Sequence, residues 1–313
     1  MLNRRHLRVK VLQSLYAFFQ SGNNDLSSGE KELFHGIEKI HDLYLFQFLL
    51  LVELHHQEAR TIEDNRNKYI PTSEDLNPNK RLLENRVLGL ISESKELESL
   101  CKRRKITWDK HQDIVRKLLT HLKQQPYYKA YLEKESVGFD DDREFIVKLI
   151  KKDLFHFELL HSFYEENSIY WIDDWELVNM MMVKTIKGIE SDAPDQSMVL
   201  MELYKDPEDK VFARELFART ILNQKEMDEA ISAKTKNWEI DRIALMDVII
   251  MKMALTEILK FDHIPVKVSL NEYIELSKMY STPKSNQFIN GVLDKLVEEF
   301  IATNKINKNV KGL

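Results

Sequence analysis

The residues best suited to chemistry are three arginines near the start of the sequence, Arg4, Arg5 and Arg8, with no acidic residue among residues 1–10. A helix over residues 3–20 would place all three on one surface, because residues three and four apart are neighbours on a helix. Guanidinium groups bind phosphate oxygens through paired hydrogen bonds and stack on bases. The spacing indicates a phosphate- or RNA-binding surface, and a solvated basic helix end is the alternative.

A second candidate site lies at the start of the last predicted helix, residues 283–303. Phe288 stands beside the apolar stripe of that helix, and an aromatic ring offers a stacking surface for an unpaired base. Polar residues precede it, at the end of a helix that attracts anions. They are Lys284, Ser285, Asn286 and Gln287. This group fits RNA binding, and a phenylalanine that only packs against the core is the alternative.

Two acidic residues are candidates for contacting a basic partner. Asp247 lies off the polar arc of a helix predicted over residues 239–261, which is otherwise apolar nearly all round. It either pairs inside the protein or meets a partner chain. Glu272 follows Ser269 at the spacing of a capping box, so a structural role is the alternative to partner binding.

Metal-binding and catalytic patterns are weak. Glu53/His56 and Glu158/His161 have the Glu-x-x-His spacing of di-iron sites in helical bundles, but ten histidines in a helical chain make such pairs common by chance. The eight glycines never lie closer than seven residues apart. That spacing excludes the glycine-rich turns of P-loops, dinucleotide-binding folds and nucleophile elbows. We therefore expect no enzyme activity, no metal and no cofactor.

Composition narrows the class of protein further. The 313 residues suggest about two domains, and a net charge of −5 gives no overall nucleic-acid signature. The single cysteine, Cys101, excludes an internal disulfide, and the basic residues beside it predict a mildly activated surface thiol. The longest apolar run, around residues 43–54, is too short to cross a bilayer, and no signal-peptide pattern is visible. We expect a cytoplasmic protein without a membrane segment.

Almost every segment has the helical period, and no alternating strand pattern occurs, so an all-α fold is predicted. Prolines and polar clusters mark the breaks between helices. The predicted helices span residues 3–20, 31–62, 80–104, 108–124, 142–167, 173–190, 208–222, 224–236, 239–261, 269–280 and 283–303.

The sequence also contains an internal echo at a constant offset of 67 residues. Asp142, Phe145, Leu149, Trp171 and Asp174 correspond to Asp209, Phe212, Leu216, Trp238 and Asp241. Repeats of this kind form stacked supersecondary units. The echo predicts a duplication of residues 142–189 and 209–256, and coincidence among similar amphipathic helices is the alternative.

The two ends of the chain resemble the NusB family of bacterial transcription antitermination proteins. At the N-terminus, the arginine cluster followed by Gln13–Tyr16 is similar to the family's arginine-rich first helix. The C-terminal motifs are Phe212–Leu216, Trp238 with Asp241–Arg242, Asp262–Pro265, Val268–Glu272, Glu275–Lys278 and Asn286–Lys295. The last two are the most specific, because they keep the family's spacing within one helix-loop-helix.

The resemblance implies a fold of two small helical bundles that binds boxA-type single-stranded RNA together with the ribosomal protein NusE. This complex joins an RNA polymerase assembly that promotes antitermination in ribosomal RNA transcription. The implied RNA-contacting residues are Arg4, Arg5, Arg8, Lys284, Ser285, Asn286, Gln287 and Phe288. The implied partner-facing residues are Asp247 and Glu272. His6 stands where the family often has an arginine, and Lys284 where it can have an acidic residue.

The length departs from the family, whose members are commonly near half this size. We therefore expect a discontinuous NusB-like core of residues 1–29 and 206–304, a helical insertion of residues 30–205 and a basic flexible tail of residues 305–313. Two other functions stay open. The chain could be a helical scaffold or dimerisation protein with a NusB-like core, or the RNA-binding part of a ribosomal RNA methyltransferase, which the glycine spacing disfavours. The basic stretch of residues 102–117 has no assigned role.

Overall fold

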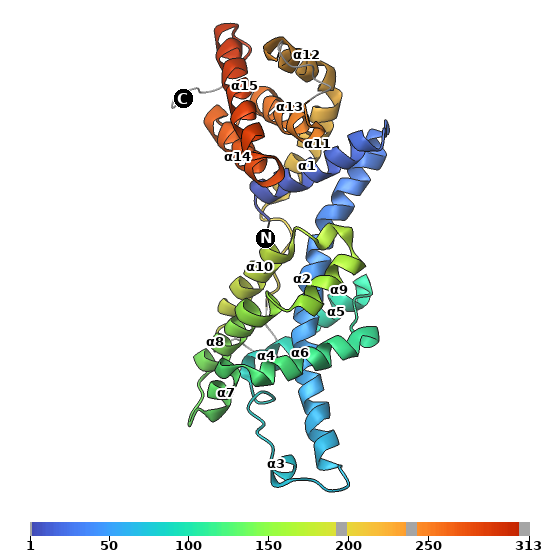
Figure 1. Cartoon of the computed structure of the whole chain (residues 1–313), viewed down its shortest axis with the longest axis vertical. Coiled ribbons are helices and arrows are strands. Elements are labelled where there is room, and N and C mark those ends of the chain that lie inside the picture. Colours follow the sequence, from blue (N-terminus) through green and yellow to red (C-terminus); the bar gives the residue numbers. More distant parts are fainter. Residues whose placement is uncertain (1, 192–198, 236–242, 307–313) are drawn as a thin grey trace. The chain divides into compact units, whose positions relative to one another are not determined.

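The computed structural model describes residues 2–191, 199–235 and 243–306. The prediction of an all-α fold is confirmed, because within these ranges the regular elements are helices and the only β-type pairing is an isolated bridge between Leu2 and Tyr204. The chain divides into two compact units (Figure 1). Unit 1 comprises Met1–Ile37 and Tyr204–Leu313, and unit 2 comprises Glu38–Leu203.

Unit 1 is built around one buried helix. Its helices are α1 (Arg4–Gln20), α11 (Pro207–Leu222), α12 (Gln224–Lys234), α13 (Leu245–Lys260), α14 (Val266–Tyr280) and α15 (Pro283–Ala302). Every residue of α13 from Asp247 to Ile258 is buried, and the helix packs against the other five (Figure 1). The expected central position of this helix is confirmed. Residues 236–242, which include Trp238 and Asp241 of the echo, lie outside the described residues.

Local sequence patterns predict the start of α15 but not the start of α14. Thr282 caps α15 by accepting a hydrogen bond from the Ser285 N–H at 3.2 Å, and Pro283 occupies the first turn, as the sequence predicts. The predicted capping box at Ser269 is wrong. Helix α14 begins three residues earlier, at Val266, because Pro265 precedes it in extended conformation and lacks the N–H that would continue the preceding turn.

Unit 2 contains most of α2 and the helices that follow it. They are α2 (Leu26–Arg66), whose first residues belong to unit 1, α3 (Ser73–Leu76), α4 (Arg86–Ser92), α5 (Lys95–Arg104), α6 (Gln112–Gln124), α7 (Pro126–Glu133), α8 (Phe139–Leu149), α9 (Glu158–Asn167) and α10 (Trp175–Lys187). A π-helical turn, Ile150–Leu154, continues α8. The structure thus divides two predicted helices, residues 80–104 and 142–167, and adds α7, since Pro126 starts a helix there instead of only ending one.

Aromatic side chains fill the core of unit 2. The Trp108 ring stacks on Phe163 with ring centres 5.0 Å apart, and its indole N–H donates to the Phe46 carbonyl at 3.1 Å. Trp171 donates in the same way to the Lys39 carbonyl at 2.8 Å. Each indole is therefore buried with its polar atom satisfied, the usual condition for burying tryptophan.

Cys101 and His41 are two of the titratable groups that are buried in unit 2. Cys101 is 4% exposed, so the prediction of a surface thiol is wrong, and burial raises the pKa of that thiol to about 12. The apolar face of α5, which the neighbouring basic residues do not reveal, turns Cys101 inward. Burial also lowers the pKa of His41 to about 4.

One glycine of unit 1 lies at a close helix approach. A Cβ atom on Gly29 would come within 2.8 Å of ring carbons of both Phe18 and Phe217. Gly89, on α4 of unit 2, has no heavy atom within 4 Å of the corresponding position. Only the first glycine is therefore required by packing.

Within the described ranges, none of the helices has both the length and the apolar character that crossing a membrane requires.

Candidate nucleic-acid interface

The start of α1 is set by a reciprocal cap. The Asn3 side-chain oxygen accepts from the His6 N–H at 3.1 Å, and His6 Nδ1 accepts from the Asn3 N–H at 3.3 Å. Burial, with help from the nearby Arg5 charge, lowers the pKa of His6, which keeps the imidazole in the neutral form that can accept. The cap makes Arg4 the first helical residue and so sets the directions of the arginines that follow.

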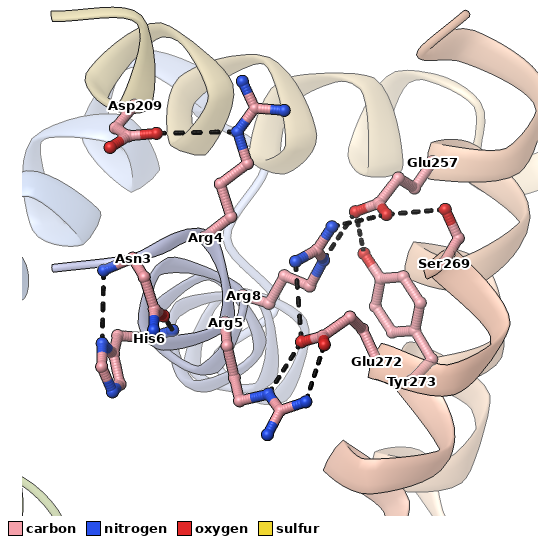
Figure 2. A network of polar contacts seen from close by, with 10 residues as sticks. All are labelled: Asn3, Arg4, Arg5, His6, Arg8, Asp209, Glu257, Ser269, Glu272 and Tyr273. Atoms are coloured by element: carbon pink, nitrogen blue, oxygen red, sulfur yellow. Dashed lines mark hydrogen bonds and ion pairs between the residues drawn. The ribbon is translucent and has the colours of Figure 1, made fainter. Parts of the chain in front are cut away.

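Arg8 points into the protein. Its side chain donates to Glu257 through Nε at 2.8 Å and Nη2 at 2.7 Å, and only 3% of the residue is exposed (Figure 2). The guanidinium also lies over the Phe212 and Tyr273 rings, 5.2 and 5.9 Å from their centres. The prediction that the three arginines share one exposed surface is therefore wrong for Arg8. Its position one turn after Arg4 faces α13, whose buried carboxylate binds it.

Glu257 is the centre of this buried network. Besides the two bonds from Arg8, it accepts from Ser269 Oγ at 2.7 Å and from the Tyr273 hydroxyl at 3.0 Å. Burial raises the pKa of Tyr273 well above its usual value, and the neighbouring carboxylate acts in the same direction, so the hydroxyl stays a donor. A fully buried carboxylate is tolerated only when it is paired in this way. The network joins α1, α13 and α14.

Arg5 is held at the surface by Glu272. Arg5 donates to the carboxylate through Nε at 2.9 Å and Nη2 at 2.7 Å, and Arg8 Nη1 lies 3.7 Å from the same group (Figure 2). The bonds from Arg5 lower the pKa of Glu272. Half of the Arg5 side chain remains exposed. Glu272 therefore binds α1 and is not the acceptor of a capping box, the local role that its spacing from Ser269 suggests.

Arg4 is the other accessible cation of the cluster. Its Nε lies 3.6 Å from Asp209 on α11, and its guanidinium lies over the Phe212 ring, 5.2 Å from the centre. About a third of the side chain is exposed. A single long contact and one aromatic neighbour leave several of its N–H donors for a ligand.

A cavity of ≈ 450 Å³ opens beside these arginines. Its walls come from the start of α1 and from the loop and first turns around α14, and they include His263, Pro265 and Val268. None of residues 284–288 lines it. The sequence does not predict that His263, Pro265 and Val268 line a site, because no local pattern indicates that the loop before α14 faces the start of α1.

The second predicted RNA-binding group lies on the first turns of α15. Lys284 and Gln287 are exposed, whereas Ser285, Asn286 and Phe288 are half-buried. Thr282 and Ser285 are occupied with capping, their hydroxyls 3.0 Å apart. Part of the Phe288 ring therefore reaches the surface, beside polar side chains that can donate hydrogen bonds.

Asp247 is 3% exposed and accepts a hydrogen bond from Ser281 Oγ, at the end of α14. Of the two interpretations that its position allows, the structure shows internal pairing. Its carboxylate connects the start of α13 to the end of α14, so it is not an exposed charge that awaits a partner.

The two Glu-x-x-His pairs belong to unit 2 and have other contacts. Glu53 accepts from Gln112 at 2.8 Å and lies 3.9 Å from His56 Nδ1. His161 Nε2 lies 2.8 Å from the Phe155 carbonyl. Among the residues that the structure describes, no three His, Cys, Asp or Glu side chains come together as metal ligands would.

The basic stretch of residues 102–117 also belongs to unit 2 and runs from the end of α5 into α6. Arg104 binds Asp42 at 2.7 Å. The exposed cations are Lys102, Arg103, Lys105, Lys110, Arg116 and Lys117, with Asp109 and Asp113 exposed among them. This surface is separate in sequence and in unit from the arginine cluster of α1.

Comparisons with known proteins agree on one family. The model of the NusB family matches residues 172–298, from just before α10 into α15. The chain is 43% identical over 117 residues to the transcription antitermination protein NusB of Salinibacter ruber, covering 37% of this chain and 73% of that protein. It is 37% identical over 112 residues to NusB of Chloroherpeton thalassium (36% of this chain, 53% of that protein) and 44% identical over 82 residues to NusB of Natranaerobius thermophilus (26% and 59%).

A solved structure of NusB from T. maritima is 24% identical, with a TM-score of 0.31, and the match covers 52% of this chain and 95% of that one. The similarity to the Salinibacter protein is both high and spread over nearly three quarters of its length, although the chain spans only 53% and 59% of the other two relatives. The chain belongs to the NusB family.

Proposed function

We propose that this protein is a non-enzymatic transcription antitermination factor that binds boxA-type RNA together with the ribosomal protein NusE during ribosomal RNA transcription. The observation that carries the proposal is the family membership, joined to two accessible arginines beside a cavity in unit 1. The three relatives described above are each named transcription antitermination protein NusB.

The RNA surface comprises Arg4 and Arg5 on α1 and the first turns of α15. Arg4 supplies donors for a phosphate, and Arg5 keeps half of its side chain exposed while Glu272 holds its orientation. The partly exposed Phe288 ring offers a stacking surface for a base. The residues before it on α15 add donors and one positive charge; they are Lys284, Ser285, Asn286 and Gln287.

Arg8 acts in this proposal through the fold. With its guanidinium engaged by Glu257 and 3% of the residue exposed, it positions α1 so that the two preceding arginines face outward. The NusE-facing roles of Asp247 and Glu272 are likewise indirect, since Ser281 and Arg5 occupy their carboxylates. They shape the surface that NusE meets.

We assign this function to unit 1, the NusB-like core, and regard unit 2 as an insertion into it. Unit 1 contains the arginine cluster, the cavity and the start of α15. Its two sequence segments, Met1–Ile37 and Tyr204–Leu313, lie on either side of the insertion.

The test is a fluorescence-anisotropy titration of the full chain with a boxA-type RNA, with and without NusE, over a series of salt concentrations. Each lost phosphate contact reduces the slope of log affinity against log salt by about 0.7 for single-stranded RNA. We expect Arg4→Ala and Arg5→Ala to reduce both affinity and slope. Lys225→Ala, at an exposed position on α12, is the control and should change neither.

The proposal fails if the RNA binds no more tightly than an unrelated RNA of the same length, with or without NusE. Unchanged affinity and slope in the Arg4→Ala/Arg5→Ala double variant would refute the assigned RNA surface. A chain that binds no RNA in any condition would instead support the scaffold alternative.

A further inference from the structure

Three helices of unit 2 correspond to three helices of unit 1 at the offset of 67 residues. Helix α8 with its π-helical turn, residues 139–154, falls on α11. Helix α9 falls on α12, and α10 falls on the first part of α13. The packing corresponds as well, since α8 contacts α10 as α11 contacts α13.

A fourth correspondence adds a helix that lies outside the 67-residue offset. Helix α4 packs on α8 as α1 packs on α11. An asparagine caps both α4 and α1. The residue after each cap, Arg86 or Arg4, pairs with a buried aspartate in the first turn of α8 or α11, respectively. The Arg86 Nε–Asp142 distance is 3.2 Å and the Arg4 Nε–Asp209 distance is 3.6 Å. Unit 2 thus repeats the arrangement α1–α11–α12–α13.

The two arrangements differ in what covers the last helix. In unit 1, α14 and α15 follow α13 and pack on it, and α13 is buried on all sides. In unit 2, no described helix follows α10 before the chain enters unit 1. Met180 on α10, which corresponds to Asp247, is 56% exposed, whereas Asp247 is 3% exposed. Lys184 and Lys187 are likewise exposed where Met251 and Ala254 are buried.

A groove of ≈ 490 Å³ lies along this open face. Its apolar walls are Ile150, Phe155, Met180 and Val183. Asn179, which is 4% exposed, lines the groove, and its side-chain oxygen has no hydrogen-bond partner. A buried carbonyl oxygen of this kind costs free energy until a donor reaches it.

Positive charge borders the groove. Lys151 lines it, and Lys184 and Lys187 are exposed one turn beyond Met180 and Val183 on α10. Glu176 is the acidic residue in its lining. A two-fold contact with a second copy would bring equal lysine rims together, which like-charge repulsion disfavours.

We propose that this groove binds an amphipathic helix of a partner protein, with acidic residues beside its apolar stripe, in the position that α14 has on α13. The helical shape follows from α14, which covers the corresponding face in unit 1. The apolar stripe matches the groove walls, and the acidic flank matches the lysine rim.

The test uses the full chain and a fluorescein-labelled helical peptide of about 18 residues, long enough to be stable as a helix. The peptide has leucines at i, i+3, i+4 and i+7 and glutamates beside them, and a second peptide has lysines in place of the glutamates. We expect saturable binding of the glutamate peptide and at least about tenfold weaker binding of the lysine peptide.

Substitutions test whether the glutamate peptide binds at this groove. Met180→Glu should weaken binding of the glutamate peptide at least about tenfold. Met279→Glu, at a methionine of α14 that is 64% exposed, is the matched control and should leave it unchanged. Because Met180 is exposed, its replacement should leave the circular dichroism and melting of the chain unaltered. Lys184→Glu with Lys187→Glu should reverse the preference between the two peptides.

Three results would overturn the proposal. The first is no saturable binding of either peptide, and the second is equal binding by the wild type and Met180→Glu. The third is a self-associated chain in sedimentation equilibrium that Met180→Glu converts to monomer, which would identify a second copy as the occupant.

Discussion

The buried Arg8–Glu257 pair should make unit 1 depend on two residues that are 249 positions apart. We consider Arg8→Met, Glu257→Gln and the double variant. Arg8→Met leaves the fully buried Glu257 carboxylate without its cation, and Glu257→Gln leaves the buried Arg8 charge with only the longer 3.7 Å contact to Glu272. Breaking a buried pair from one side costs about 3–5 kcal/mol of unfolding free energy.

The double variant should be much less destabilised than the sum of the two. It removes both buried charges of this pair, and methionine can pack against the Phe212 and Tyr273 rings that now contact the guanidinium. The Ser269 and Tyr273 hydroxyls both donate to Glu257, and the carbonyl oxygen of glutamine can still accept from one of them. We expect a coupling free energy of at least about 2 kcal/mol, at the upper part of the range for residues within one network.

The measurement has to resolve unit 1 from unit 2. Three of the four tryptophans, Trp108, Trp171 and Trp175, belong to unit 2, so fluorescence reports mainly on that unit. Hydrogen exchange followed by mass spectrometry gives separate opening free energies for peptides from α1, α13 and α14 and for unit 2 as the internal reference. Arg214→Met, which loses a half-exposed pair with Glu30 at 3.7 Å, is the control and should cost below about 1 kcal/mol.

A loss of unfolding free energy in either single variant as small as in Arg214→Met would refute the role of the buried pair. That role is also refuted if the two single effects add to the double within about 0.5 kcal/mol, because residues that do not interact behave in that way.

Three further predictions concern stability and reactivity. Because the folded pKa of His41 is about 4, below the ordinary 6.5, unit 2 should lose about 2 kcal/mol of stability as the pH falls from about 7 to about 5. Urea unfolding followed by tryptophan fluorescence measures this loss, and a wild-type pH dependence in His41→Gln would contradict it. Gly29→Ala should destabilise unit 1 by about 1–3 kcal/mol through overpacking against two phenylalanine rings, whereas Gly89→Ala on open α4 should be neutral or stabilising by up to about 1 kcal/mol. Equal melting shifts for the two glycine variants would contradict the close approach. Cys101 should react with a thiol reagent only upon unfolding, since burial raises its pKa to about 12. Full labelling of the native chain within minutes would show that the thiol is accessible.

Much of the local structure could be predicted from the sequence. The last helix is an example, because its apolar stripe, its Thr282 cap and Pro283 are all within one segment. The apolar character of α13 on all sides likewise predicts a central helix, and the structure has one. Interactions between residues close in sequence determine these features, so a single chain segment contains the information.

The predictions that failed depend on which other helix packs against a given helix face. Arg8, Cys101 and Glu272 each occur in a polar or basic stretch that suggests an exposed side chain, yet the first two are buried and the third binds α1. The α14 start failed for a related reason, since Ser269 satisfies the buried Glu257 in place of a local helix end.

By itself, the sequence determined the helical class, the central helix, the family and the existence of an arginine-rich first helix. Only the tertiary structure decided which arginines reach the surface, because α13 and α14 supply the acidic side chains that bind Arg5 and Arg8. Periodicity indicates which residues share a helix face, but it does not contain the identity of the helix that covers that face.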